Sequence, residues 1–364
     1  MYYYHLIIGL GSELIIKNTI SLFLFCKWIS LFSQSISSKK MSTSVLQKLN
    51  AFQGKKILVI GDVILDIYLK GKVDRISPEA PIPILNHQHT SHALGGAANV
   101  AANLKGLGAE VTLISVTGQD GEAEYLETML DLEDIGHHLV KLNDRPTTSK
   151  TRVIAGSQQM IRIDHESIAD INQESENQII LVIENLISSH NFYAIVLEDY
   201  NKGMLSATMI EKITKAAASN QIPVVVDPKK NNFFEFKRVA LFKPNFKECA
   251  AQIPFPLEPT LESLSKADQY LRGRLNHKIS MITLAEHGIF ITDGIDKYLV
   301  PTEIRQISDV SGAGDTVTAI ATFGLIESLS LSEIATLSNQ SAGHVCGIPG
   351  VHAITKEELA HLLN

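Results

Sequence analysis

Short apolar runs alternate with helical patterns along the chain from about residue 56 onward. Each apolar run is short enough for a buried strand, and helical stretches such as 206–220 lie between the runs. This alternation predicts an α/β fold with a parallel sheet covered by helices on both faces. The expected strands are "KILVIGD" (56–62), "EVTLISVTG" (110–118), "YAIVLED" (193–199), "IPVVVDP" (222–228) and "ISMITLAEHG" (279–288).

Two stretches break the alternation. Residues 64–94 contain three prolines and predict short extended pieces without a long helix, and residues 148–164 predict a hairpin around "AGSQQ". Together they would form a small sheet, a lid that covers a site and excludes water; a plain edge hairpin is the alternative. With no internal repeat and no linker, we expect a single domain over residues 41–364.

Residues 1–40 differ from the rest of the chain. They are rich in aromatic and aliphatic residues, but Glu13, Lys17 and Lys27 interrupt the apolar runs before they reach the roughly 18 residues of a membrane span. A basic start and a small-residue cleavage site are both missing, which does not fit a signal peptide. We expect an N-terminal extension outside the fold, such as one left by a misassigned start codon; a membrane-surface anchor is the alternative.

Composition and charge exclude several classes of partner. The chain has 364 residues, of which 45% are hydrophobic and 20% charged, as in ordinary soluble proteins. Its net charge of −7, without a basic block, indicates neither a nucleic acid nor an anionic membrane as partner. The three cysteines are far apart and form no CxxC, so they predict neither disulfides nor a zinc site and suit the cytoplasm.

Polar residues follow the expected strands directly. In parallel α/β sheets, ligands bind beyond the carboxyl ends of the strands. Asp62 and Asp66 there could accept hydrogen bonds from sugar hydroxyls, or could cap a turn. A second group of polar residues would face the same crevice, namely Lys229, Lys243, Asn245 and Glu248. Of these, Asn245 and Glu248 could handle a nucleotide phosphate and a hydrated Mg²⁺, with solvated loop charges as the alternative.

The stretch "GGAANVAANLKGLG" (95–108) predicts a small-residue helix with a glycine at its C-terminus. Gly95 and Gly96 allow close approach of the backbone to a ligand or to another backbone segment. Tight helix–sheet packing with Asn99 as a capping residue is the alternative interpretation.

The stretch "DVSGAGDTVTAI" (309–320) predicts an anion site. Gly312, Ala313 and Gly314 leave the backbone N–H groups at a helix start unobstructed. An acidic residue that merely serves the helix dipole would not need two glycines, each of which costs about 1 kcal/mol relative to alanine. Asp315 beside this site could accept a proton from a hydroxyl that attacks a phosphoryl group. P-loop, GxGxxG, HExxH and GxSxG motifs are all missing.

These last two stretches resemble the two signatures of the PfkB (ribokinase-like) carbohydrate kinase family, and the likeness runs from about residue 55 to 363. Val310, "RISPEAPIPI" (75–84) and "QQMIRID" (158–164) resemble the branch that phosphorylates heptose 7-phosphate. The resemblance implies a ribokinase-like three-layer α/β/α Rossmann-like core, with a mostly parallel central sheet and a small β lid. It also implies ATP-dependent phosphorylation of D-glycero-β-D-manno-heptose 7-phosphate at its anomeric hydroxyl, with Mg²⁺ and a monovalent cation as expected cofactors.

By motif position, the resemblance also implies roles for individual residues. Asp315 would be the catalytic base, and residues 312–314 would form the anion hole. The sugar would be held by Asp66, Gly95, Gly96 and Asn99, with Asp199 near the substrate or metal. The ATP phosphates and Mg²⁺ would lie among Asp227, Lys229, Asn245 and Glu248. The nucleotide pocket would include Thr283, Glu286 and Gly288, with Asn339 and Gly343 near the adenine.

A phosphorylated acceptor needs a second anion site, for which arginine is well suited. The candidates are Arg75, Lys150, Arg152 and Arg162, and the alternative for the arginines is a surface salt bridge with Asp74 or Asp164. Two departures from the branch weaken the substrate prediction: Ile67 stands where an arginine is usual, and the segment around His344 and Cys346 differs, with both of these residues expected in packing roles.

The sequence has no nucleotidyl-transfer motif, so we expect a kinase that depends on a separate adenylyltransferase for the next step. We also expect a homodimer, because lid strands pair between subunits in this family. Two other functions remain open. One is the same fold acting on fructose, ribose, a fructose phosphate or a nucleoside, and the other is a non-catalytic sensor, which would not need Asp315 as a base.

Overall fold

The computed structural model describes residues 44–302 and 307–363. The expected N-terminal extension, residues 1–40, therefore lies outside the described residues. The described chain divides into two units, residues 44–50 with 363 and residues 51–362. Residues 44–50 are helical. Everything below concerns the unit 51–362, and the prediction of a single domain over 41–364 stays a prediction.

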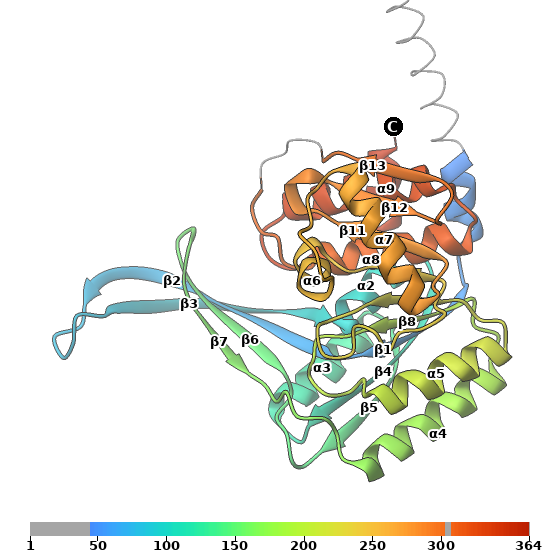
Figure 1. Ribbon diagram of the computed structural model, residues 1–364. Coiled ribbons are helices and arrows are strands. Elements are labelled where there is room, and N and C mark those ends of the chain that lie inside the picture. Colours follow the sequence, from blue (N-terminus) through green and yellow to red (C-terminus); the bar gives the residue numbers. More distant parts are fainter. Residues whose placement is uncertain (1–43, 303–306, 364) are drawn as a thin grey trace, which may run out of the picture. The chain divides into compact units, whose positions relative to one another are not determined.

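The larger sheet is mostly parallel, as the strand–helix alternation predicted (Figure 1). Its strands follow the order β13-β12-β11-β10-β9-β8-β1-β4-β5, and the strands from β11 to β5 in this order are all parallel to one another. The parallel strands are β1 (Lys56–Gly61), β4 (Glu110–Gly118), β5 (Gly136–Leu142), β8 (Ala194–Glu198), β9 (Val224–Asp227), β10 (Leu241–Phe242) and β11 (Ile279–Thr283). The antiparallel edge consists of β12 (Ile289–Thr292) and β13 (Lys297–Val300).

Helices cover both faces of this sheet. Alternate residues of β8 separate the faces: Ile195 and Leu197 belong to the apolar core beneath α4, α5 and α7, so Val196 and Glu198 point to the opposite face. The first face is covered by α4 (Gln173–Ser189), α5 (Ala207–Ser219), α6 (Phe246–Gln252) and α7 (Leu261–Leu275). The opposite face is covered by α2 (Ala97–Gly106), α8 (Ala313–Ile326) and α9 (Leu331–Cys346).

The remaining helices are α3 (Gly121–Leu132), which lies along β4 and β5, α10 (Lys356–Leu362) and the single 3₁₀ turn η1 (Ala285–His287). None of the helices in the described ranges is both long enough and apolar enough to span a bilayer. The predicted three-layer α/β/α architecture is confirmed.

The small sheet consists of β2 (Val63–Ile76), β3 (Pro83–Gly96), β6 (Ser149–Ala155) and β7 (Gln158–His165), in the order β3-β2-β6-β7. The predicted hairpin at 148–164 is confirmed as β6 and β7. The prediction of short extended pieces over 64–94 is wrong, because β2 and β3 are continuous strands of 14 residues each (Figure 1). Pro78 and Pro81 lie in the turn, and Pro83 begins β3, so none of them removes a hydrogen bond from a strand interior.

The small sheet is joined to the helical layer without a loop. Gly96 is both the last residue of β3 and the N-cap of α2. Its φ of 57° is left-handed, and a Cβ there would lie 2.5 Å from the Asp62 carbonyl oxygen. A residue without a side chain is therefore required where the strand turns into the helix.

Candidate active site

Asp315 lies in the first turn of α8 and is 3% exposed. The N-cap residue Gly312 has a left-handed φ of 82°, and a Cβ at this position would lie 2.7 Å from Asn99 Nδ2. Glycine at 312 thus has two physical causes, the backbone angle and the close approach of α2. The first N–H groups of a helix have no acceptor within the helix. Those at the start of α8, next to Asp315, are therefore available to an anion.

Two donors hold the Asp315 carboxylate. Asn99 Nδ2 donates to Oδ2 at 2.7 Å, and the Tyr200 hydroxyl donates to Oδ1 at 2.7 Å. Burial raises the pKa of Asp315 to about 6, although both hydrogen bonds act to lower it. Burial and the nearby Asp315 raise the pKa of Tyr200 well above its usual value, so the phenol remains a donor. Asp315 is therefore ionised at neutral pH, and its pKa is close enough to neutral pH for the carboxylate to accept a proton.

A buried network behind Asn99 fixes its orientation. Asn103 Nδ2 donates to Asn99 Oδ1 at 3.0 Å, and Asn103 Oδ1 accepts from Thr316 Oγ1 at 3.0 Å. Asn99 is not the N-cap of α2, because that position is Gly96 and no side chain caps this helix. The capping interpretation of Asn99 is therefore wrong.

Asp227, the last residue of β9, lies between two lysines. Lys243 Nζ contacts its Oδ2 at 2.8 Å, and Lys229 Nζ contacts its Oδ1 at 3.1 Å. Burial acts to raise the pKa of Asp227, but the two lysines together bring it below its usual value. Lys229 Nζ also lies 3.0 Å from Glu248 Oε1. Asn245 and Glu248 form the capping box of α6, in which Glu248 Oε2 accepts from Asn245 N at 2.7 Å.

Glu198 is a further acidic residue in this region, and the sequence analysis did not single it out. It is in register with Asp227 on the neighbouring strand and is 0% exposed. Burial, followed by Asp227 and Asp315, raises its pKa well above the usual value. Neither carboxylate oxygen has a hydrogen-bond partner among the described residues. A carboxylate at the end of an apolar strand is the sequence signal that could have identified it.

The predicted sugar-binding residues lie where β2 and β6 pair. The Asp66 carboxylate accepts a short hydrogen bond from Arg152, and Arg152 Nη2 lies 3.5 Å from Ser311 Oγ. A Cβ on Gly95 would lie 2.3 Å from Asp66 Oδ2, so glycine at 95 makes room for this carboxylate. Lys150 is in register with Asp66, and its Nζ lies 5.7 Å from the centre of the Tyr200 ring. Burial lowers the pKa of Lys150.

The structure places the other two anion-site candidates differently: Arg75 lies far from this group, and Arg162 lies in register with Arg152 on the neighbouring strand β7. Arg75 is exposed near the far end of β2, nine residues beyond Asp66, which places it roughly 30 Å away along the strand. Arg162 pairs on the exposed strand β7 with Asp164 at 2.7 Å, which is the surface salt bridge weighed as its alternative.

The predicted nucleotide residues surround the end of β11. Thr283 is its last residue and bridges to Asn245, and Gly288 has a left-handed φ of 95° at a point where a Cβ would meet the Val300 carbonyl oxygen at 1.9 Å. Glu286 is exposed in η1. Asn339 on α9 donates to the carbonyls of Val300 and Pro301 at 3.1 and 2.9 Å, and Gly343 lies one turn further along α9.

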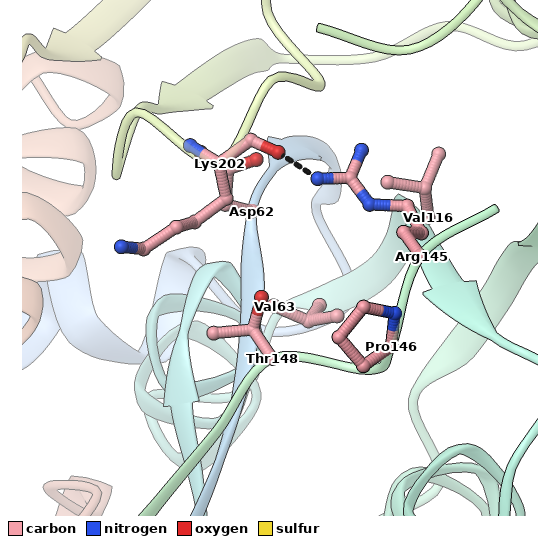
Figure 2. Close-up of a pocket in the computed structure, with 7 residues that line it drawn as sticks. All are labelled: Asp62, Val63, Val116, Arg145, Pro146, Thr148 and Lys202. Carbon is pink, nitrogen blue, oxygen red and sulfur yellow. Dashed lines mark hydrogen bonds between the residues drawn. The ribbon is translucent and has the colours of Figure 1, made fainter. Parts of the chain in front are cut away.

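The remaining strand-end acids support the loop that carries Tyr200. Asp62 accepts hydrogen bonds from the N–H groups of Tyr200 and Lys202 at 2.8 and 3.0 Å. Figure 2 shows this loop beside a small pocket, with Arg145 bonded to the Lys202 carbonyl. Burial raises the pKa of Asp199 to about 7, and its Oδ1 accepts from Asn201 N at 2.7 Å. Asp62 thus positions this loop, in agreement with the turn-capping alternative. The residues that line the small pocket do not include Asp315.

The residues fit a hydrated Mg²⁺ better than a closed protein cage. In the described part of the chain, no three His, Cys, Asp or Glu side chains are grouped so that they would hold a metal ion by themselves. Mg²⁺ commonly takes one or two carboxylates and completes its shell with water and substrate phosphates. Asp227 and Glu248 could supply those carboxylates, because both contact the same ammonium nitrogen.

A buried carboxylate at a helix N-terminus, with lysines at the same carboxyl edge of a parallel sheet, is an arrangement compatible with phosphoryl transfer. Comparison with known proteins agrees. The family model described as pfkB family carbohydrate kinase matches residues 54–357. The chain therefore belongs to the pfkB family of carbohydrate kinases.

Individual relatives and solved structures support this membership. The bifunctional protein HldE of Aliarcobacter butzleri is 40% identical over 304 residues, covering 83% of this chain and 63% of that protein. The bifunctional protein HldE of Campylobacter curvus is 38% identical over 85% of this chain and 65% of its own. The chain thus spans somewhat less than two thirds of the length of these relatives.

Similar solved structures include phosphofructokinase-2 from Escherichia coli in complex with substrates and products, with a TM-score of 0.72, 19% identity and coverage of 85% and 98% of the two chains. Arabidopsis thaliana ribokinase complexed with ribose and ATP has a TM-score of 0.66, 18% identity and coverage of 86% and 99%. At such identities these structures support the ribokinase-like fold alone.

Proposed function

We propose that the chain transfers the γ-phosphoryl group of ATP to a sugar phosphate, D-glycero-β-D-manno-heptose 7-phosphate, to give the 1,7-bisphosphate. One observation carries this proposal: the buried Asp315 carboxylate is held by Asn99 and Tyr200 on the sheet edge where Asp227 gathers two lysines. A sensor would have no need of a carboxylate placed in this way.

The proposed reaction uses these groups in a defined order. The acceptor hydroxyl gives its proton to Asp315 as its oxygen forms a bond to the γ-phosphorus, and the bond from this phosphorus to the bridging oxygen breaks to release ADP. The first-turn N–H groups of α8 (residues 312–314) and the Lys229 ammonium stabilise the charge on the transferred group. Mg²⁺, when bound by Asp227 and Glu248, supplies further neutralisation of the phosphates.

The identity of the acceptor rests on the resemblance of residues 75–84 to the heptose branch and on the similarity to the HldE proteins. Lys150 adds a physical argument. It is partly buried near Tyr200, and no carboxylate among the described residues lies within ion-pair distance of its Nζ. An unpaired, partly buried ammonium beside the sugar residues favours an acceptor that carries its own negative charge.

Several expectations stay predictions within this proposal: a monovalent cation near residues 309–315, a homodimer, a cytoplasmic location and a separate adenylyltransferase for the next step. The relatives are named as bifunctional proteins, which leaves open whether that next activity is separate here.

A kinase assay with ATP over a panel of neutral and phosphorylated sugars tests the proposal. We expect heptose 7-phosphate to be used with a kcat/KM at least about tenfold above fructose, ribose, fructose 6-phosphate and nucleosides, a preference worth about 1.4 kcal/mol. Turnover of neutral sugars alone would overturn the substrate, and no turnover of any sugar would overturn the kinase activity.

A further inference from the structure

The Lys229 ammonium bridges two carboxylates whose other oxygens are already engaged. Asp227 Oδ2 is bound to Lys243 and its Oδ1 to Lys229, at 2.8 and 3.1 Å. Glu248 Oε2 accepts from the Asn245 N–H, and its Oε1 lies 3.0 Å from Lys229 Nζ. Each carboxylate is thus fixed in orientation by one oxygen, and the other two oxygens converge on a single cationic atom.

Glu198 shows that this region has more acceptor oxygens than the chain's own donors satisfy. It is fully buried, lies in register with Asp227 and has no hydrogen-bond partner for either oxygen among the described residues. An unpartnered buried carboxyl group is costly, and it is usually explained by a ligand, an ion or a functional role. Glu198 therefore marks a place beside Asp227 where the chain's own groups leave room for a ligand or an ion.

An ammonium group and a divalent cation cannot lie between Asp227 Oδ1 and Glu248 Oε1 at the same time. Mg²⁺ binds oxygen ligands directly at about 2.0–2.1 Å, or at a greater distance through its waters. We infer that the Lys229 ammonium keeps a free divalent cation out of this position. The ammonium leaves the two carboxylates only when the cation arrives together with a triphosphate, whose oxygens then bind the ammonium.

The surroundings of Lys229 allow this exchange. Its side chain is a flexible stem with a compact charge, and its Nζ lies 5.0 Å from the centre of the Tyr200 ring. Tyr200 in turn donates to Asp315, so an ammonium that moves along this ring stays next to the proposed base. The cation would consequently enter as a metal–nucleotide complex and not before the nucleotide. This inference rests on the proposed function in one respect, namely that a nucleotide displaces Lys229.

The test measures binding of Mn²⁺ alone to the full chain by electron paramagnetic resonance, which reports free Mn²⁺. We expect Lys229→Met to bind one Mn²⁺ at least about tenfold more tightly than the wild type, because removal of a unit charge at this distance outweighs the about 1.4 kcal/mol that a factor of ten requires. Lys230→Met, which removes the same charge from the adjacent exposed lysine, should bind like the wild type. Lys229→Met combined with Glu248→Gln should lose the added affinity.

Equal Mn²⁺ affinity in Lys229→Met and the wild type would overturn the inference. Should Lys229→Met fail to fold, Lys229→Arg and the wild type carry the test. Without a nucleotide, both proteins should bind Mn²⁺ poorly, and with a non-hydrolysable ATP analogue both should bind one Mn²⁺. Tight binding of Mn²⁺ without the analogue would overturn the inference. No sugar takes part in this measurement, so a failed sugar panel would remove the proposed function without changing the Mn²⁺ result.

Discussion

Asn99 Nδ2 donates a 2.7 Å hydrogen bond to Asp315 Oδ2 and thereby joins the first turns of two helices whose contacting residues are 216 positions apart. The bond needs glycine at 312, because a Cβ there would lie 2.7 Å from the same nitrogen. The two glycine-containing sequence stretches thus meet at one carboxylate.

The pH dependence of the reaction should follow this contact. The proposed base Asp315 must be ionised to accept a proton, so kcat/KM should fall as the pH drops through the Asp315 pKa of about 6. Asn99→Ala removes a hydrogen bond that stabilises the ionised form of Asp315, so the pKa of Asp315 should rise. The acid limb of the pH profile should then move to higher pH by about one unit. Tyr200→Phe should move it in the same direction. Asn232→Ala, which alters an amide bonded to Leu205 O, should not, and an acid limb that stays in place in both site variants would contradict the assignment.

Replacing the base itself should separate binding from chemistry. Asp315→Asn keeps the size of the side chain but cannot accept the proton, so we expect turnover to fall by about 10²- to 10⁴-fold. Binding of ATP and of the sugar, measured by calorimetry, should remain close to wild type. Retained turnover would show that another group takes the proton.

The acceptor's phosphate should depend on Lys150. Lys150→Met should raise KM for a sugar phosphate by about tenfold or more, since it removes a partly buried ammonium, and should leave KM for neutral sugars nearly unchanged. The matched control is Lys215→Met on the exposed face of α5, where the ammonium pairs with Glu211. Equal effects of Lys150→Met on both kinds of sugar would argue against a phosphate contact.

Gly95 should be required for the position of Asp66. In Gly95→Ala the new Cβ would lie 2.3 Å from Asp66 Oδ2, so the variant should lose about 1–3 kcal/mol of unfolding free energy and raise KM for the sugar. Gly273→Ala, in the last turn of α7 with no atom within 4 Å of the new Cβ, should instead gain up to about 1 kcal/mol. Urea unfolding measures both, and similar behaviour of the two variants would show that the contact with Asp66 is unimportant.

The main sheet was predictable because its expected strands correspond to short apolar runs in the local sequence. The run at 193–199 became β8 within one residue at each end, and its buried apolar positions are consistent with helices on both faces. That Asp227 and Asn245 lie at the same edge was predictable for a related reason, since parallel strands present their carboxyl ends at one edge; their role in a site stays a prediction.

Other parts of the site depend on contacts that no local pattern reveals. Tyr200 reaches Asp315 because Asp62, far away in sequence, holds the backbone of its loop. Arg75 was predicted as an acceptor-phosphate residue because it lies in one of the two lid-like stretches, which the prolines suggested would be made of short extended pieces. Those prolines lie in the turn and at the start of β3, so β2 continues and carries Arg75 away.

The junction at Gly96 has a mechanical consequence. Because β3 passes into α2 with no intervening residues, the small sheet is joined to the helix that carries Asn99 through Gly96 alone. Any tilt of β3 toward a bound sugar would rotate the first turn of α2, and Asn99 would transmit that rotation to Asp315 through their hydrogen bond. Arrival of the acceptor and alignment of the base would then be a single movement.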